Sequence, residues 1–387
     1  MSNASVRSPR KRIAIFLDGT WNSTKSNTNV WRLAALCAAH GRDGVPQVTH
    51  YNIGVNGLWG GMFGKGVAAN VIDAYEWLVG QYNPEDEIFI FGFSRGAFTA
   101  RSLAGFIAKY GLVKPGAPLG VAQLFERYRR ADDRTIWKLA AEESAGTLES
   151  PSLEERWMLR YSMPVTVKMV GVWDTVGALG VPWFSIEGVS RSSFGWLHTG
   201  LRLPIQHAFH ALAVDEHRFS FAPTPWTVLS TTQAAPRSLD SVEQRWFPGN
   251  HGSVGGGYSG DLLVQSPLKW LKSKAEQLGL SFRYDVEVDP DAHQAPIADS
   301  YSDFMNGVYK GFSKRHLRDI APPPFKGERG THTRVNETID VSVFDRWRSN
   351  VSYRPVNVRD WAKRYKVDPA TLTASVMANA PSDIVAD

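Results

Sequence analysis

The chain of 387 residues carries a formal net charge of +5, and 43% of its residues are hydrophobic. That length and composition indicate a globular protein of one large domain or two, with ample apolar material for a core. The single cysteine excludes an intramolecular disulfide and a cysteine-based zinc site. The chain has no apolar run of about 18 residues, so no transmembrane helix is predicted. It also lacks the stripe of basic residues interleaved with aromatics that would indicate nucleic-acid binding.

The N-terminal segment, residues 1–11, is basic and is expected to form a disordered tail. It lacks the hydrophobic core of a signal peptide, so we expect a chain that is cytoplasmic as synthesised and that any export would follow a signal-independent secretion route. The apolar pattern then predicts a strand at 12–18, a helix at 29–39, a strand at 48–53, a glycine-rich loop at 54–66 and a helix at 67–81. An apolar run at 88–93 predicts the next strand, and a helix is expected to follow it to about residue 110.

Two stretches interrupt this alternation and are expected to form lid insertions. Residues 114–160 are rich in proline, glycine and charge, and residues 181–203 place large aromatic side chains among polar ones. The remaining pattern predicts a strand at 164–174, a helix at 206–214, a strand at 242–247 and a helix at 266–279. Alternating strands and helices predict an α/β protein with a doubly wound, mostly parallel sheet. We expect one domain over 12–360 and a helical or flexible extension over 361–387.

The most informative motif is Gly92-Phe93-Ser94-Arg95-Gly96, which lies between the apolar run and the helix that follows it. A serine at such a strand-to-helix turn has a strained backbone, and its hydroxyl is exposed above the sheet. The two glycines leave room for neighbouring backbone to approach closely. This arrangement is typical of the nucleophile elbow of α/β-hydrolases, and it makes Ser94 the candidate nucleophile.

A serine hydroxyl is a weak nucleophile, and it needs a base that is itself oriented by a carboxylate. In α/β-hydrolases the acid and then the histidine follow the serine along the chain. Asp174 ends the next strong strand after Ser94, and His251 follows a later one, so these two residues are the candidate acid and base. Asp215 is the alternative acid, although a structural ion pair with Arg218 is the other interpretation of that residue.

Two backbone N–H groups should stabilise the oxyanion that forms during ester cleavage. One belongs to Arg95, the residue after the nucleophile, and the Asp18-Gly19-Thr20 turn at the end of the first strand offers the second. We expect the Gly19 amide, or that of Thr20, to be this donor, with Asp18 in a supporting role. Chemistry of this kind needs no metal ion or organic cofactor.

The motifs together resemble the DUF2235 family, an α/β-hydrolase domain that includes the Tle1-type phospholipase effectors of bacterial type VI secretion. The resemblance covers roughly residues 12–360. It is carried by Ile15-Phe-Leu-Asp-Gly-Thr-Trp-Asn22, Gly92-Phe-Ser-Arg-Gly-Ala-Phe-Thr-Ala-Arg101, Gly171-Val-Trp-Asp-Thr-Val-Gly177, His210-Ala-Leu-Ala-Val-Asp-Glu216, Trp246-Phe-Pro-Gly-Asn-His251, Gly255-Gly-Gly-Tyr258 and Tyr353-Arg-Pro-Val-Asn357. The matching positions imply a lipolytic serine hydrolase that uses Ser94, Asp174 and His251.

One departure from the family pattern lies beside the candidate base. The family usually has His-Ser-Asp-Val, whereas this chain has His251-Gly252-Ser253-Val254. The resemblance implies a phospholipid or other ester substrate, and a secretion or immunity protein as a partner. The basic character of the chain is the reason to expect peripheral contact with a membrane. Two other functions stay open, namely a carboxylesterase for small or polymeric esters and a non-catalytic binding module that retains the fold.

Overall fold

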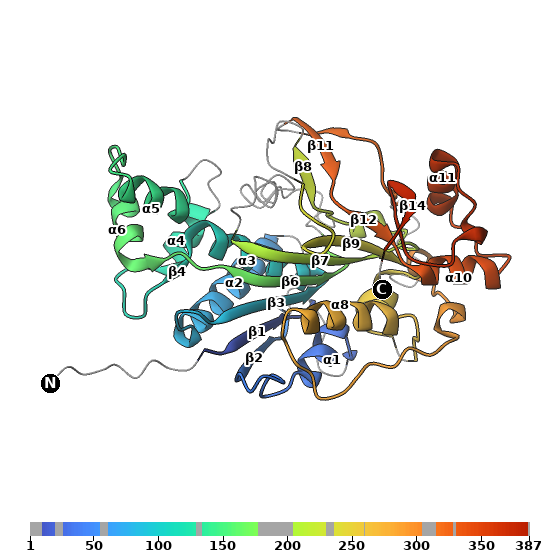
Figure 1. Cartoon of the computed structure of the whole chain (residues 1–387), viewed down its shortest axis with the longest axis horizontal. Coiled ribbons are helices and arrows are strands. Elements are labelled where there is room, and N and C mark those ends of the chain that lie inside the picture. Colours follow the sequence, from blue (N-terminus) through green and yellow to red (C-terminus); the bar gives the residue numbers. More distant parts are fainter. Residues whose placement is uncertain are drawn as a thin grey trace.

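The computed structural model describes residues 10–19, 26–54, 61–128, 134–176, 204–229, 236–258, 260–303, 315–327 and 330–385. These residues form a nine-stranded sheet in the order β14-β13-β12-β9-β7-β6-β3-β1-β2, seen from the side in Figure 1. Seven neighbouring strands, from β2 to β12, run parallel. The predicted α/β class with a doubly wound, mostly parallel sheet is therefore confirmed.

Five of the seven parallel strands lie where the sequence analysis placed strands, whereas β7 was predicted as a helix and β12 was not predicted. Their bounds are β1 Arg12–Leu17, β2 Gln47–Asn52, β3 Glu87–Phe93, β6 Val167–Trp173, β7 Ile205–Ala213, β9 Val242–Phe247 and β12 Glu337–Ile339. For β7 a helix was predicted at 206–214, and this prediction is wrong. Although six consecutive residues of β7 from Ala208 onward are buried, Gln206, His207 and His210 interrupt its apolar residues, so the sequence shows neither a continuous apolar run nor a strict alternation.

Helices cover both faces of the sheet. Helices α1 (Asn29–Leu36) and α8 (Gln265–Gln277) pack on one face, and α2 (Gly61–Gln81) and α3 (Arg95–Tyr110) pack on the other. Alternate residues of β1 supply the two cores, with Ile13 and Ile15 on the α2 and α3 side and Phe16 on the α1 and α8 side. Helix α2 begins at Gly61, so the glycine-rich loop predicted at 54–66 ends earlier than expected.

The first expected insertion, residues 114–160, contains three short helices packed together at one end of the molecule (Figure 1). They are α4 (Val121–Tyr128), α5 (Ile136–Ser144) and α6 (Leu153–Tyr161), and the short strands β4 (Leu112–Val113) and β5 (Ser162–Met163) flank them. Buried Phe125, Leu139 and Met158 join the core of α2 and α3. The lid role of this insertion stays a prediction, and the second one, residues 181–203, lies outside the described residues.

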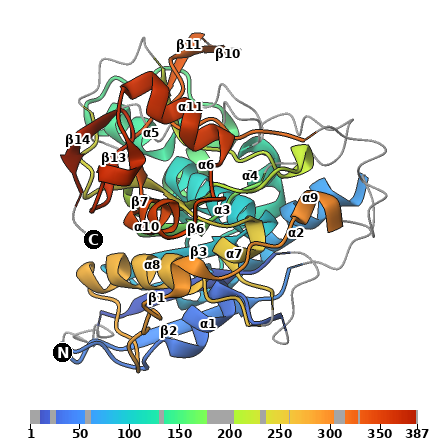
Figure 2. The same cartoon turned by 90° about the vertical axis from the view of Figure 1, so that its right-hand side faces the viewer.

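The C-terminal part of the chain completes the far edge of the sheet. Helices α10 (Val341–Ser349) and α11 (Val356–Tyr365) pack around buried Trp246 and Trp361. Strand β13 (Val376–Met377) pairs antiparallel with β12, and β14 (Ala380–Ile384) pairs antiparallel with β13. Residues 361–387, predicted as a helical or flexible extension, thus contribute two strands to the main sheet, and Figure 2 shows these elements gathered together. The domain boundaries themselves stay a prediction.

The remaining elements are short. They are α7 (His251–Gly255), α9 (Ser300–Asp303) and a separate three-stranded sheet of β8 (Thr227–Leu229), β10 (Phe325–Gly327) and β11 (Gly330–Arg334). Among the residues that the structure describes, no helix combines the length and the apolar character that crossing a bilayer requires.

Candidate active site

The candidate residues gather at the carboxyl edge of the parallel strands. Strands β2 and β3 lie on opposite sides of β1, so the chain reverses its direction of winding there. In open α/β sheets such a switch point is where ligands bind, outside the carboxyl ends of the strands. Ser94, Asp174 and His251 directly follow or lie just beyond β3, β6 and β9 at this edge.

Ser94 occupies a sharp turn between β3 and α3. Its φ of +59° lies in the left-handed region, which costs energy for a residue with a side chain. A Cβ at Gly96 would lie 2.2 Å from the Leu17 carbonyl oxygen, and one at Gly92 would lie 2.5 Å from that of Gly96. The strand before the turn and the helix after it therefore approach too closely for any side chain larger than that of glycine at these two positions.

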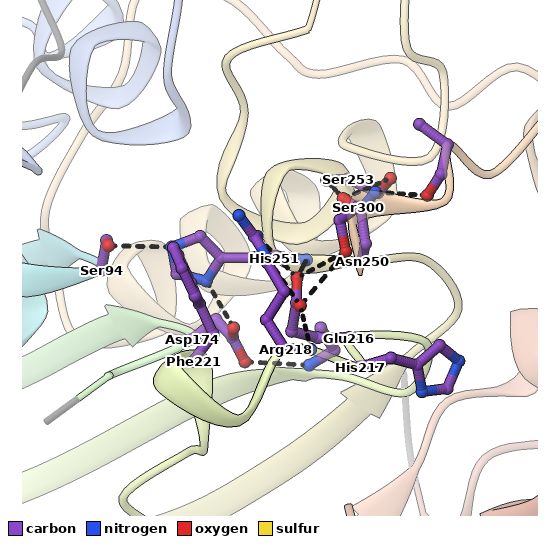
Figure 3. Close-up of polar contacts among 12 residues, drawn as sticks. Ser94, Asp174, Glu216, His217, Arg218, Phe221, Asn250, His251, Ser253 and Ser300 are labelled. Carbon is purple, nitrogen blue, oxygen red and sulfur yellow. Dashed lines mark hydrogen bonds and ion pairs between the residues drawn. The ribbon is translucent and has the colours of Figure 1, made fainter. Parts of the chain in front are cut away.

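The imidazole of His251 connects the other two candidates, as Figure 3 shows. Its Nε2 lies 2.8 Å from Ser94 Oγ, and its Nδ1 lies 2.6 Å from Asp174 Oδ2. All three residues are buried, with 8% of Ser94, none of Asp174 and 6% of His251 exposed. The structure thus brings together three residues that lie up to 157 positions apart, in the hydrogen-bonded order in which a base can accept the serine proton.

Asp174 is held from several sides. Arg318 donates two hydrogen bonds to its carboxylate, at 2.6 Å to Oδ1 and 2.9 Å to Oδ2, and the Ala213 backbone N–H donates to Oδ1 at 3.1 Å. Burial alone would raise the pKa of Asp174, but the Arg318 charge and the His251 hydrogen bond outweigh it and hold the pKa well below its ordinary value. Asp174 is therefore expected to be a carboxylate at neutral pH.

Burial and aromatic contacts define the surroundings of His251. Phe93 and Phe221 pack against its ring, with centroids 4.6 and 4.9 Å away. Burial lowers the pKa of His251, and the hydrogen bond with Asp174 only partly opposes this effect. A neutral imidazole is the form that can accept a proton, so these contacts keep His251 ready to act as a base.

A second carboxylate fixes the backbone that carries His251. Glu216 accepts a hydrogen bond from the His251 N–H at 3.2 Å and from Ser300 Oγ at 3.1 Å. Arg218 pairs with Glu216, through its Nε at 2.9 Å and its Nη2 at 2.8 Å, so the alternative ion pair between Arg218 and Asp215 is not the one that forms. Figure 3 places this network on the side of His251 away from Ser94.

Asp215 follows strand β7 and not a helix as the sequence pattern suggested. Its Oδ2 accepts hydrogen bonds from the Gly249 N–H at 2.7 Å and from the Tyr353 hydroxyl at 2.9 Å. Gly249 lies two positions before His251, so Asp215 braces the loop that leads to the base. The carboxylate that contacts the imidazole is that of Asp174.

The Asp18 turn at the end of β1 is also held by hydrogen bonds. Asp18 accepts from Thr28 Oγ1 at 2.5 Å, from the Tyr51 hydroxyl at 2.8 Å and from the Gly19 N–H at 2.7 Å. In this conformation the Gly19 amide is engaged by Asp18, and Thr20 lies outside the described residues. The second oxyanion donor therefore stays a prediction. The same is true of the first donor, the N–H of Arg95, the residue at which α3 begins directly after Ser94.

The departure from the family pattern lies in the first turn of α7. The Asn250 side chain caps this helix and accepts hydrogen bonds from the Ser253 N–H at 3.0 Å and from Ser253 Oγ at 3.3 Å. A Cβ at Gly252 would lie 2.4 Å from the Tyr258 ring. The pair Gly252-Ser253 is thus accommodated by a capping contact and by a close aromatic neighbour.

Two residues of the site were missed from the sequence, namely Arg318 and Glu216. Arg318 lies in a polar, proline-rich stretch that carries no recognisable motif, and only the folded chain brings it to Asp174. Glu216 lies within the matched His210-to-Glu216 motif, which was the available signal. Among the described residues, no three His, Cys, Asp or Glu side chains cluster in a way suited to a metal ion.

Comparison with known proteins identifies the family of the chain. Residues 11–274 match the family model described as the catalytic domain of Tle1-like phospholipase effectors of the type VI secretion system. The chain belongs to this family. The family predicted from the motifs is confirmed.

Individual relatives of this Tle1-like domain are distant. An uncharacterized protein of Saccharomyces cerevisiae, YEL023C, is 25% identical over 253 residues, which are 58% of this chain but 34% of the relative. The chain thus spans about a third of the curated relative it matches. Solved structures with similar folds include an uncharacterized protein from Pseudomonas aeruginosa (16% identity, 79% of this chain and 51% of that one, TM-score 0.46).

Two further solved structures are similar at the same low level. The Tle1 effector bound to the VgrG spike of the type VI secretion system is 19% identical, over 68% of this chain and 53% of that one, with a TM-score of 0.37. Esterase 2 of Thermogutta terrifontis phosphorylated by paraoxon is 13% identical, over 71% of this chain and 85% of that one, also with a TM-score of 0.37.

Proposed function

We propose that this Tle1-like domain is a serine ester hydrolase that works through an acyl-enzyme, with Ser94 as nucleophile, His251 as base and Asp174 as the orienting acid. One observation carries the proposal, namely the imidazole of His251 between Ser94 Oγ at 2.8 Å and Asp174 Oδ2 at 2.6 Å. These distances are those of hydrogen bonds along which a proton can move.

In the first half of the reaction, Ser94 Oγ attacks the carbonyl carbon of the ester while His251 Nε2 accepts the hydroxyl proton. The tetrahedral intermediate collapses as the bond to the leaving alcohol breaks, and His251 gives its proton to that alcohol. In the second half, a water molecule loses a proton to His251 and attacks the acyl-enzyme. The acid is released, and the proton returns to Ser94.

Asp174 supports both halves of this reaction from beneath the imidazole. Its hydrogen bond to Nδ1 holds His251 in the tautomer that leaves Nε2 free to accept a proton, and its negative charge favours the imidazolium that forms transiently. The Arg95 N–H and a second amide from the Asp18-Gly19-Thr20 turn would stabilise the oxyanion. For the Gly19 amide to serve, its hydrogen bond to Asp18 would have to open when substrate binds.

The family supports a lipid ester, and phospholipid in particular, as the substrate. A related Tle1 effector has been solved bound to the VgrG spike, so a secretion protein of that kind, and export by a signal-independent system, belong to the same proposal. Peripheral contact with a membrane would follow from the substrate. We propose no metal or organic cofactor, since the reaction written above balances without one.

The test begins with labelling by a fluorophosphonate, which reacts with activated serines. We expect the wild-type protein to be labelled and Ser94→Ala to be neither labelled nor active. Ser102→Ala, a change in α3 away from the elbow, is the matched control and should keep both properties. Absence of label on the folded wild type, under conditions that label a control esterase, would contradict the proposal and favour a binding module.

The substrate class is tested separately with phospholipid vesicles and with soluble short-chain esters. Mass spectrometry of the products, wild type against Ser94→Ala, identifies the bond that is cut. We expect turnover to rise when a lipid passes from monomers to vesicles. Turnover of soluble esters without any hydrolysis of phospholipid vesicles would assign the protein to the carboxylesterases instead.

A further inference from the structure

Arg318 is a buried arginine beside Asp174, and its guanidinium makes four hydrogen bonds. Two reach the Asp174 carboxylate at 2.6 and 2.9 Å, and the others reach the backbone oxygens of Ala213 at 2.9 Å and Phe221 at 2.6 Å. Neither Arg318 nor Asp174 exposes any of its side chain. Such paired contacts match the planar fork of a guanidinium to the two oxygens of a carboxylate.

The chain segment that carries Arg318 lies outside the family-matched residues 11–274. It is positioned by backbone pairing with the loop after β7, since Arg315 forms an isolated bridge with Arg218 and the His316 N–H donates to the His217 oxygen at 2.8 Å. In this extended segment Leu317 is exposed while Arg318 turns inward to Asp174. The segment thus delivers one side chain into the site.

The charges that face His251 form two pairs. Asp174 lies beside Arg318, and Glu216 lies beside Arg218. The charges of Asp174 and Glu216 favour protonation of His251, and that of Arg218 opposes it. Arg318, placed directly behind the carboxylate, reduces the negative charge that the imidazole experiences from Asp174.

We propose that Arg318 is a positioning residue of the triad, which aims the Asp174 carboxylate at His251 and offsets its negative charge. This inference deepens the proposed function and rests on it. Its consequence is that a segment beyond the family-matched residues changes the pH at which His251 becomes protonated. With Arg318 present, His251 stays neutral to a lower pH than it would beside an unpaired carboxylate.

The first measurement is the titration of His251 itself, followed by NMR in protein with isotope-labelled histidine. The His251 resonance is identified by its loss in His251→Gln. We expect Arg318→Gln to raise the pKa of His251 by about one unit, and Arg318→Lys, which keeps the charge, to leave it near the wild-type value. Arg315→Gln is the matched control, because Arg315 pairs with Asp299 at the surface, and it should change nothing.

The second measurement is the pH dependence of kcat/KM on a soluble ester for the same variants. We expect the acid limb of Arg318→Gln to move to higher pH together with the NMR titration, and kcat of Arg318→Lys to fall about tenfold, because an ammonium cannot hold both carboxylate oxygens. A merely structural role would lower the melting temperature or kcat without moving the acid limb, and that outcome would overturn the proposal.

The two measurements separate this inference from the proposed function. An inactive wild type would refute the ester hydrolase, whereas the NMR titration needs no turnover and still tests Arg318. If Arg318→Gln does not fold, the His251 titration is measured on the wild type and on Arg318→Lys. A wild-type His251 that titrates at or above the ordinary histidine pKa of 6.5 would overturn the inference.

Discussion

Two neighbouring parallel strands of this protein each lead to an aspartate, and the two aspartates do different things. Asp174 follows β6 and Asp215 follows β7, two strands that pair along most of their length. Both carboxylates lie at the edge of the sheet that carries Ser94 and His251, with Asp174 fully buried and Asp215 partly buried. Position at a strand end therefore does not by itself assign the acid of the triad.

The difference lies in the partners that reach each carboxylate. Asp174 contacts the cation of Arg318 and the imidazole of His251, and these contacts hold its pKa below the ordinary value in spite of burial. Asp215 accepts hydrogen bonds from a backbone N–H and from the Tyr353 hydroxyl. Burial raises its pKa, and these hydrogen bonds, together with the more distant charges of His217 and Arg346, only partly oppose this effect. One carboxylate is kept charged beside the base, and the other braces a loop.

The largest expected effect comes from exchanging the Asp174 carboxylate for an amide. Asp174→Asn should lower kcat about 10⁴-fold, because Asn no longer holds His251 in the productive tautomer. It also leaves the buried Arg318 cation without its counter-charge. Ester hydrolysis under saturating substrate measures this, with circular dichroism as a check on folding, and Asp215→Asn serves as the matched control. A greater loss of kcat in Asp215→Asn would reverse the assignment of the acid.

The pH profile of the wild type should show the same contrast. Burial lowers the pKa of His251, so the neutral base persists as the pH falls through 6.5, the ordinary value. Below the shifted pKa, kcat/KM should fall about tenfold per pH unit as the imidazole is protonated. Asp215→Asn should leave the midpoint of this limb unchanged, since Asp215 does not contact the ring. A midpoint above the ordinary value would contradict the account of the site.

A smaller effect, on stability, is expected at the other aspartate. Asp215→Ala leaves the Gly249 N–H and the Tyr353 hydroxyl without their acceptor, which should lower the free energy of unfolding by about 2 kcal/mol. The pKa of Asp215 is higher in the folded state than its value of about 4 in the unfolded chain. As the pH rises from below about 4 through the folded-state pKa, the unfolded chain loses this proton first, so the wild type loses stability over that range. The loss caused by alanine should therefore be larger at about pH 4 than at about pH 7, as denaturant unfolding would measure. A loss that grows with pH would show that Asp215 is stabilised as the anion.

The smallest effect is expected for Tyr353→Phe, which removes one hydrogen bond to Asp215 and keeps the ring. A cost of about 1 kcal/mol in unfolding free energy is expected, with kcat within a factor of two or so. Thermal unfolding and the ester assay together measure it. A large loss of kcat would mean that the loop carrying His251 depends on Tyr353 more than the contacts indicate.

Much of the fold could be predicted from local pattern. Helices α1, α2, α3 and α8 show apolar residues at helical spacing, and β1 and β3 are short apolar runs beside turns. Strand β7 could not be predicted in the same way, because Gln206, His207 and His210 interrupt its apolar residues and three of the others are alanine, a helix-favouring residue. The short edge strands β13 and β14 were missed because strands of so few residues, one of them largely exposed, have no distinctive pattern.

The triad candidates could be named from the sequence because each one is tied to a local signal. Ser94 lies between two glycines that the turn requires, and Asp174 and His251 follow apolar strands in the order Ser, Asp, His. Arg318 has no such signal, since its role depends on a partner 144 positions away. Tyr353 lies in the matched Tyr353-to-Asn357 motif, but the motif does not reveal that its hydroxyl reaches Asp215 across 138 positions.

The sequence by itself determined the elements that depend on near neighbours: the strained turn at Ser94, the apolar strands that place acid and base at one edge, and the family to which the chain belongs. Only the tertiary structure decided which aspartate reaches His251 and which cation holds that aspartate. The physical reason is that a carboxylate takes its character from the charges and donors around it, and these arrive from remote parts of the chain.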